Sequence, residues 1–450
     1  MRGSEWSRWD LHVHTPASLV QSYGANDDLT WERFLTDLEA LPAEVTVVGI
    51  NDYLEVEGYK RVCAERDAGR LQNLRLVLPV IEFRIARFAG QAQWQRVNFH
   101  VVFSDQVDPS TIEQELLSSL NREYTLDDGN VWSGPPLRDR LAELGRRIKQ
   151  CGPPPTDPAS DLLVGFHNFN VDPEDMRRLL ERSNAFRGRY VTAVGLGEWS
   201  QLRWDGSAAE KRSIVNTADF VLTATSSPAS FDRGRQALMA NTVQSRLLHS
   251  SDAHFFSDAT EPNRIGRSLT WIKALPTFEG LLLARHEYEH RVFVGSGEPP
   301  QLQAVRESPT KFIRSVSFVR AGGEGPPWFN GQDIHLNPGL VAIIGNKGSG
   351  KSALGDAIAL VGNADVEDHL SFLSANRFRN IRTGSASEFT CRLGWESGDS
   401  ETRNLGEHVD GDKPERVRYL PQNYFERLCS DVAEDSVARR SVDTGLKPRD

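Results

Sequence analysis

The sequence predicts an α/β fold, with a barrel of parallel strands in the first 300 of its 450 residues and a smaller domain after them. Three observations support this. Short β-type runs alternate with amphipathic helical patterns at residues 30–41, 110–124, 137–150 and 173–184. A break rich in Gly and Pro follows at residues 295–309. The β-type runs number seven and cover residues 45–50, 74–83, 97–103, 162–167, 192–197, 220–225 and 245–254.

The break divides the chain into a first domain at 1–297, a semi-rigid linker at 298–311 and a second domain at 312–450. Apolar residues make up 39% and charged residues 25%, as in globular proteins. No apolar run is long enough to span a bilayer, and the N-terminus has no signal-peptide pattern. The four cysteines form no CxxC motif. We therefore expect a cytoplasmic protein in a reducing compartment, without a membrane partner.

The net charge of −10 excludes nucleic-acid binding by bulk charge, because non-specific affinity comes from Lys and Arg that neutralise phosphates. A nucleic-acid partner must therefore meet a local patch. One candidate is the stretch 377–392, where arginines alternate with phenylalanines. A solvated sheet edge is the alternative explanation of that stretch.

Histidines and acids concentrate at the ends of the predicted strands. His12 and His14 lie two residues apart, so on a strand both imidazoles point the same way and can share one metal ion. Barrel strands converge at one mouth, which brings distant residues together. Imidazole and carboxylate ligands suit zinc, manganese or iron(II). The other residues in this set are Asp52, Glu82, His100, His167, Glu198, Asp252 and His254.

These segments resemble the successive motifs of the polymerase-and-histidinol-phosphatase (PHP) phosphoesterases, metal-dependent enzymes with a distorted (β/α)7 barrel. The resemblance covers residues 8–256. The matching motifs are DLHVH, VVGINDY, LPVIE, NFHVV, GFHN and SSDAH.

The resemblance implies a centre of two or three divalent ions, with Glu82 as a bridge. Tyr53 stands where the common PHP pattern has His, so either the third ion is absent or the Tyr53 phenol meets the substrate. The implied ligands are His12, His14, Glu82 and Asp252 for one ion, Glu82, His100 and His167 for a second, and Asp52, Glu198 and His254 for the rim or a third. Glu82, His100, Asp252 and His254 are the residues expected to act in catalysis.

Divalent ions activate water near neutral pH and stabilise the oxygens around phosphorus, which makes phosphoester hydrolysis the predicted reaction. Arg264 and Arg267, shortly after the SDAH motif, are candidates for gripping a substrate phosphate. The alternative is that both are exposed loop residues.

Residues 339–352 read GLVAIIGNKGSGKS, an apolar run followed by a glycine-rich loop and a helical pattern. This is a P-loop in the context that it requires. Its glycines turn backbone N–H groups toward phosphates, Lys351 reaches the β/γ-phosphates, and Ser352 can ligate Mg²⁺. A Mg-ATP site is therefore predicted. Its residues are Gly345, Asn346, Lys347, Gly348, Ser349, Gly350, Lys351, Ser352 and Gln422.

Gln422 resembles the Q-loop glutamine of ABC-class ATPases of the SMC kind. Neither an apolar run ending in Asp-Glu nor an LSGGQ-like signature follows Ser352. We therefore interpret residues 312–450 as the N-terminal lobe of such an ATPase, which either a longer protein or another chain completes. This chain alone should bind Mg-ATP weakly and hydrolyse it negligibly.

The order of the two domains resembles the TrlF-type proteins, in which a PHP domain precedes an SMC-like ATPase. The resemblance covers essentially the whole chain. It implies a homodimer or larger assembly, nucleic acid as the partner and a role in prokaryotic defence. Whether a second protein completes the system stays open. Three functions stay open. They are an ATP-regulated metal-dependent nuclease, a phosphatase for small phosphoesters or nucleotides, and a non-catalytic ATP-dependent module that binds nucleic acid or directs assembly.

Overall fold

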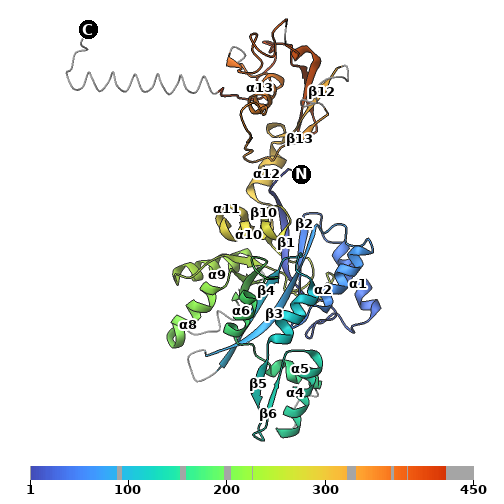
Figure 1. Cartoon of the computed structure of the whole chain (residues 1–450), viewed down its shortest axis with the longest axis vertical. Coiled ribbons are helices and arrows are strands. Elements are labelled where there is room, and N and C mark those ends of the chain that lie inside the picture. The colour runs from blue at the N-terminus through green and yellow to red at the C-terminus, as the bar shows by residue number, and fades with distance from the viewer. Residues whose placement is uncertain are drawn as a thin grey trace, which may run out of the picture. The chain divides into compact units, whose positions relative to one another are not determined.

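The chain divides into two compact units, which Figure 1 shows with their elements labelled. The barrel unit is Ser4–Pro299, and the lobe unit is the described chain from Pro300 onward together with Arg2 and Gly3. The computed structural model describes residues 2–88, 94–152, 159–196, 204–225, 227–321, 331–365, 369–382 and 384–421.

The barrel unit is built on a nine-stranded sheet that is nearly closed, with the order β11-β10-β1-β2-β3-β4-β7-β8-β9. Strands β4 and β10 are antiparallel to their neighbours, and the other pairs are parallel. The bounds are β1 Glu5–Val13, β2 Val45–Tyr53, β3 Leu76–Phe88, β4 Trp94–Phe103, β7 Tyr190–Gly195, β8 Phe220–Thr223, β9 Leu247–His249, β10 Thr270–Ala274 and β11 Val292–Val294.

The chain after β9 closes the sheet against β1. The His14 N–H donates to the Ala253 carbonyl at 3.0 Å, and the Ala253 N–H donates to the His12 carbonyl at 3.2 Å. The Ser268 hydroxyl adds a bond of 2.7 Å to the Trp9 carbonyl. These hydrogen bonds form a seam that holds the chain after β9 beside β1.

Helices cover the sheet, with α1 and α2 on one side of the barrel unit and α8 and α9 on the other (Figure 1). Helix α1 begins after Asp27, whose carboxylate accepts from the Thr30 N–H at 2.9 Å. No helix of the described residues is long and apolar enough to cross a membrane. The helices are α1 Asp28–Glu39, α2 Glu57–Asp67, α6 Pro173–Arg182, α8 Trp204–Thr217, α9 Pro228–Ala240, α10 Phe278–His286 and α11 Tyr288–Arg291.

Between β4 and α6 the chain forms an insertion, made of the β5–β6 hairpin and helices α4 and α5, which projects from the sheet (Figure 1). Helices α4 and α5 cross at Gly145 and Gly165. A Cβ atom at Gly145 would lie 1.8 Å from the Asp161 carbonyl oxygen, and one at Gly165 would lie 1.8 Å from that of Leu141. Only glycine permits this crossing. The elements are α3 Pro109–Thr111, η1 Ile112–Leu116, η2 Leu117–Ser119, β5 Arg122–Thr125, β6 Val131–Gly134, α4 Arg138–Cys151 and α5 Asp161–Asn168.

Three expectations about the barrel unit are wrong. Residues 162–167 form helix α5 instead of a strand, because Ser160 caps a helix there and Gly165 packs that helix against α4. Residues 110–124 form short helical turns and then strand β5, which pairs with β6. Strand β4 is antiparallel, because only a few residues separate it from β3, and a parallel pair needs a much longer crossover.

The lobe unit is a four-stranded antiparallel sheet, in the order β13-β12-β14-β15, with helix α13 packed on it. Its core includes Phe318, Leu360, Cys391 and Trp395. Part of the stretch predicted as a linker forms helix α12. The bounds are α12 Pro300–Glu307, η3 Pro309–Lys311, β12 Ile313–Arg320, β13 Asp333–His335, α13 Lys351–Val361, η5 Ala386–Glu388, β14 Phe389–Trp395 and β15 Ser400–Asn404.

The strand predicted before the P-loop, at residues 339–344, is not formed. The side chains of Leu340 and Ile344 are 97% and 91% exposed. No strand in the described part of the lobe unit pairs with this segment. A β-strand needs a neighbouring backbone for its hydrogen bonds, so an apolar run alone does not become one.

His249, at the end of β9, is buried in the barrel with a defined tautomer. Its Nδ1 accepts from the Leu269 N–H at 3.1 Å, so Nε2 carries the proton and donates to the Thr225 carbonyl at 2.8 Å. Burial lowers the pKa of His249 to about 4. The folded protein therefore holds this side chain in its neutral form.

We predict that His249 makes the fold sensitive to acid. The unfolded chain takes up this proton near pH 6.5 and the folded chain only near pH 4, so stability is full above pH 6.5 and falls as the pH drops toward 4. His249→Asn should lose about 2 kcal/mol less free energy of unfolding between pH 7.5 and pH 5 than the wild type. Urea unfolding at both pH values measures this. The exposed His290→Gln should keep the wild-type difference, and an unchanged pH dependence in His249→Asn would contradict the prediction.

Candidate metal centre

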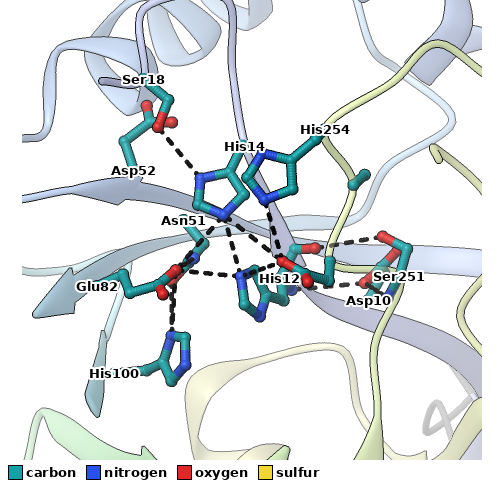
Figure 2. Close-up of polar contacts among 12 residues, drawn as sticks. Asp10, His12, His14, Ser18, Asn51, Asp52, Glu82, His100, Ser251 and His254 are labelled. Carbon is teal, nitrogen blue, oxygen red and sulfur yellow. Dashed lines mark hydrogen bonds and ion pairs between the residues drawn. The ribbon is translucent and has the colours of Figure 1, made fainter. Parts of the chain in front are cut away.

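Strand β1 supplies the first two side chains of the candidate metal centre (Figure 2). The alternation of the strand directs His12 and His14 to one side, while Leu11 and Val13 are buried in the hydrophobic core. The Nε2 atoms of the two histidines lie 3.1 Å apart. Both imidazoles therefore reach the same point.

Glu82 of β3 reaches that point as well. Its Oε2 lies 3.2 Å from Nε2 of His12 and 3.4 Å from Nε2 of His14, and it accepts from the Asn51 amide at 2.9 Å. Its other oxygen, Oε1, is buried and has no hydrogen-bond partner among the described residues. Because a buried carboxylate oxygen without a partner is costly, Oε1 is an open ligand position.

Asp252, in the chain after β9, also approaches the two imidazoles. Its Oδ1 lies 3.0 Å from Nε2 of His12 and 3.7 Å from Nε2 of His14. The backbone of Asp252 has a φ of 50°, in the left-handed region that few residues other than glycine adopt. The bonds between Ala253 and β1 fix this conformation and so aim the carboxylate at the imidazoles.

His14 and Asp252 also belong to a second group, with His254. The Nε2 of His254 lies 3.3 Å from Oδ1 of Asp252, and its ring stacks on that of His14 with 4.1 Å between centroids. Two groups of potential ligands therefore overlap. They are His12, His14 and Glu82, and His14, Asp252 and His254.

The donor set fits a divalent metal ion. Adjacent ligands at 2.0–2.2 Å from such an ion are separated from each other by about 3.0 to 3.5 Å. The separations between the imidazole nitrogens and the carboxylate oxygens, from 3.0 to 3.7 Å, lie close to that range. The side chains that can hold an ion are the buried His12, His14 and Glu82 and the partly exposed Asp252.

Opposite charges hold these side chains together. Burial by itself would lower the pKa of His12, but the carboxylates of Asp252 and Glu82 outweigh it and raise that pKa well above its usual value. Burial would raise the pKa of the Glu82 carboxyl, but the imidazoles around it hold that pKa well below its usual range. A divalent cation would replace the positive charge that a proton supplies here.

Neighbouring polar groups decide which ring nitrogens face the centre. The Nδ1 of His14 contacts the Ser18 hydroxyl at 3.2 Å, which leaves its Nε2 for the cluster. The Asn51 amide nitrogen donates to Glu82, so the Asn51 oxygen faces Nδ1 of His100 at 3.1 Å and accepts its proton. The Nε2 of His100 then carries a lone pair. Burial lowers the pKa of His100 to about 4, which keeps the ring neutral.

Three described residues of the predicted site, His100, Asp52 and His167, lie outside both ligand groups. The Nδ1 of His100 is 3.9 Å from Oε2 of Glu82. Asp52 accepts from the Thr15 N–H at 2.9 Å and from its hydroxyl at 2.8 Å, and so anchors the loop after β1. His167 is on helix α5 instead of at a strand end, with its Nδ1 2.9 Å from the Arg84 guanidinium. Glu198 lies outside the described residues.

Sequence reasoning missed three residues that shape the site, namely Asp10, Asn51 and Arg84. Asp10 accepts from the Ser251 N–H at 3.0 Å and from the His12 N–H at 3.4 Å, and so ties together two segments that carry ligands. Asp10 precedes His12 by two positions and Arg84 follows Glu82 by two, so the strand period of two was the available signal. Asn51, which lies beside the more conspicuous Asp52, carried no such signal.

A cavity of about 330 Å³ opens beside the cluster. His12, His100 and Asp252 line it, together with Asn98 of β4 and the chain at the end of β8. A bound ion would therefore face a space that can admit a small group.

In the lobe unit, the P-loop folds around its own lysine. The Lys351 ammonium donates to the Gly345 carbonyl at 2.7 Å and to the Asn346 carbonyl at 2.9 Å. Gly348 and Gly350 have φ values of 86° and 90°, which favour glycine. Helix α13 then begins at Lys351. The predicted residue Gln422 lies outside the described residues.

Comparison with protein-family models finds no match for this sequence, and no curated protein matches it. The PHP and TrlF resemblances therefore depend on the motifs alone.

We predict that Glu82→Gln, which keeps the shape of the side chain but removes its charge, weakens metal binding by at least 100-fold, roughly what the loss of an anionic ligand entails. Calorimetric titration with Mn²⁺ or Zn²⁺ and metal analysis after dialysis measure the effect. Glu279→Gln, at an exposed position of α10, is the matched control and should bind metal as the wild type does. Wild-type metal content in Glu82→Gln would rule out this centre.

Proposed function

We propose that the barrel unit is a metal-dependent phosphoesterase. The observation that carries the proposal is the buried cluster of two imidazoles and two carboxylates, in which Glu82 Oε1 has no partner among the described residues. The adjoining cavity and the resemblance to PHP enzymes support it. In this proposal Glu82 bridges two ions, and His100, Asp252 and His254 act beside it.

Bound divalent ions would supply an activated nucleophile and a positive charge beside the phosphoryl oxygens. The chain itself orients the groups around them. Asp10 and the Ala253 backbone hold the β1 histidines against Asp252, and Asn51 holds Glu82 against His100. The lone pair on Nε2 of His100 is available as a ligand or as a proton acceptor at the cavity wall.

We further propose that the P-loop binds Mg-ATP and that the nucleotide state regulates hydrolysis, with DNA or RNA as substrate. The support is the sequence of residues 345–352, the turn geometry of Gly348 and Gly350, and the resemblance to SMC-like ATPases. Dimerisation, a role in defence and a cytoplasmic location are predictions of the same resemblance.

A small phosphoester or nucleotide is the second candidate substrate. The cavity of about 330 Å³ and the net charge of −10 favour it over a long polyanion. A non-catalytic role for the barrel unit is the third candidate, and the intact ligand set argues against it.

We predict that the Mn²⁺-loaded protein hydrolyses phosphoesters and that His12→Ala lowers kcat by roughly 1000-fold or more, because one of the paired imidazoles is lost. The assay compares labelled DNA, labelled RNA, nucleotides and a chromogenic phosphomonoester, with Glu279→Gln as control. Faster cleavage of the oligonucleotides supports the nuclease, and faster cleavage of the small esters supports the phosphatase. Activity that survives in His12→Ala, or no activity in the wild type, would reject the proposed function.

We predict that Lys351→Ala weakens Mg-ATP binding by at least about tenfold, because the ammonium charge toward the phosphates is lost. Lys351 is partly exposed, and its ammonium donates to two carbonyls of the loop itself, so the melting temperature should change little. Titration with a fluorescent ATP analogue measures the affinity, with the exposed Lys311→Ala as control. Equal affinity in Lys351→Ala and the wild type would contradict a P-loop site.

A further inference from the structure

Two cross-strand pairs lie next to each other where β3 and β4 border the metal centre. Glu82 is opposite His100, and Arg84 is opposite Asn98. Directly opposite residues point to the same face of a sheet, and so do residues two apart on one strand. Both pairs therefore face the same side. The first pair is buried, whereas Arg84 and Asn98 are partly exposed, so the second pair forms the open edge of the centre.

Aromatic rings and one histidine hold the Arg84 guanidinium in place. It lies 4.4 Å from the ring centroid of Phe166 and 5.4 Å from that of Tyr53. The Tyr53 ring in turn stacks on His14, with 4.8 Å between centroids. Arginine has no acceptor atom, so Nδ1 of His167 accepts the bond of 2.9 Å from Arg84. These contacts fix the cation beside the ligand His14.

Arg84 forms no ion pair with a carboxylate in the part of the chain that the structure describes. The neighbouring carboxylates of Glu82 and Asp252 interact with imidazoles instead. A half-buried guanidinium beside a cation-binding cluster increases the positive charge on that side once a metal is bound. This arrangement favours an anionic ligand, and the planar fork of arginine matches the geometry of phosphate oxygens.

Asn98, the cross-strand partner of Arg84, lines the cavity together with His12, His100 and Asp252. The two cross-strand pairs are about 7 Å apart along the strands. An extended arginine side chain can cover most of that distance, and an asparagine side chain about half of it. A phosphate bound at the metal ligands and extending outward would therefore meet the side chains of Arg84 and Asn98.

We propose that Arg84, assisted by Asn98, binds the non-bridging oxygens of the substrate phosphate at the mouth of the metal centre. This proposal deepens the proposed function and rests on it for the metal-bound phosphoester. It assigns the phosphate grip to strands β3 and β4. The loop residue Arg264, by contrast, donates to the Glu261 carbonyl.

The competing explanation is that Arg84 only fastens helix α5 to the barrel through Phe166 and His167. A purely structural arginine would change stability and leave the affinity for free phosphate unaltered. Phe166→Leu loosens the same packing and removes one ring contact of the guanidinium, but it keeps the arginine itself. The two explanations therefore predict different rankings of Arg84→Met and Phe166→Leu by phosphate affinity.

The experiment measures binding of inorganic phosphate to the Mn²⁺-loaded full chain by calorimetry, which requires no turnover. Arg84→Met should weaken phosphate binding by about 10-fold to 100-fold, and Arg84→Lys should recover part of the loss. Metal content should stay unchanged in both. Arg61→Met is the matched control, because Arg61 also lies over an aromatic ring, that of Trp31 at 4.6 Å, but on helix α2 and paired with Asp28. Phe166→Leu should lower the melting temperature and lose clearly less phosphate affinity than Arg84→Met, because it keeps the cation.

Steady-state kinetics on the best ester adds a second readout, in which Arg84→Met should raise KM more than it lowers kcat. Metal-dependent phosphate binding that Arg84→Met weakens supports the proposal even if no ester is hydrolysed, and only the phosphoesterase function then fails. Wild-type phosphate affinity in Arg84→Met would overturn the proposal while leaving that function intact. An equal loss in Phe166→Leu and Arg84→Met would also overturn it, in favour of the structural role.

Discussion

The burial of the Glu82 carboxylate is the constraint on which the rest of the barrel unit depends. An ionised carboxylate is stable in the interior only among partners that supply charge and hydrogen bonds. Its partners come from β1, β2 and β4, and the matching carboxylate of Asp252 comes from the chain after β9. The seam between Ala253 and β1 brings these segments together. Closure of the sheet and assembly of the ligand cluster are therefore one structural event.

The sequence was sufficient to locate this cluster because two of its signals are local. The period of two placed His12 and His14 on one side, and the ends of β-type runs located Glu82 and Asp252. The apolar run at 162–167 was ambiguous, since its helical state depends on the fit of Gly165 against α4. The Asn51 contacts could not be foreseen, because they depend on the register of β2 against β3. Which residues carry the chemistry was thus more predictable than which residues orient them.

The lobe unit shows the same division between local and distant causes. The turns at Gly348 and Gly350 follow from residue type, since both backbones lie in the region that glycine favours. The conformation of the apolar run at 339–344, by contrast, is not determined by its own residues. Whether it becomes a strand depends on a neighbouring backbone, and the described strands β12 to β15 pair among themselves in an order that does not include it. A motif can therefore be present in the sequence without the strand that usually accompanies it.

The crossing of α4 and α5 gives the insertion a structural role at the metal centre. At Gly145 and Gly165 the two backbones approach so closely that a single methyl group on either would overlap a carbonyl oxygen. The last turn of helix α5 carries Phe166 and His167, both of which contact Arg84. The spacing of α4 and α5 therefore sets the position of the side chains at the rim of the candidate centre. Exchanging a hydrogen atom for a carbon at that crossing would tilt α5 and displace the side chains that line the rim, although neither glycine contacts a ligand residue.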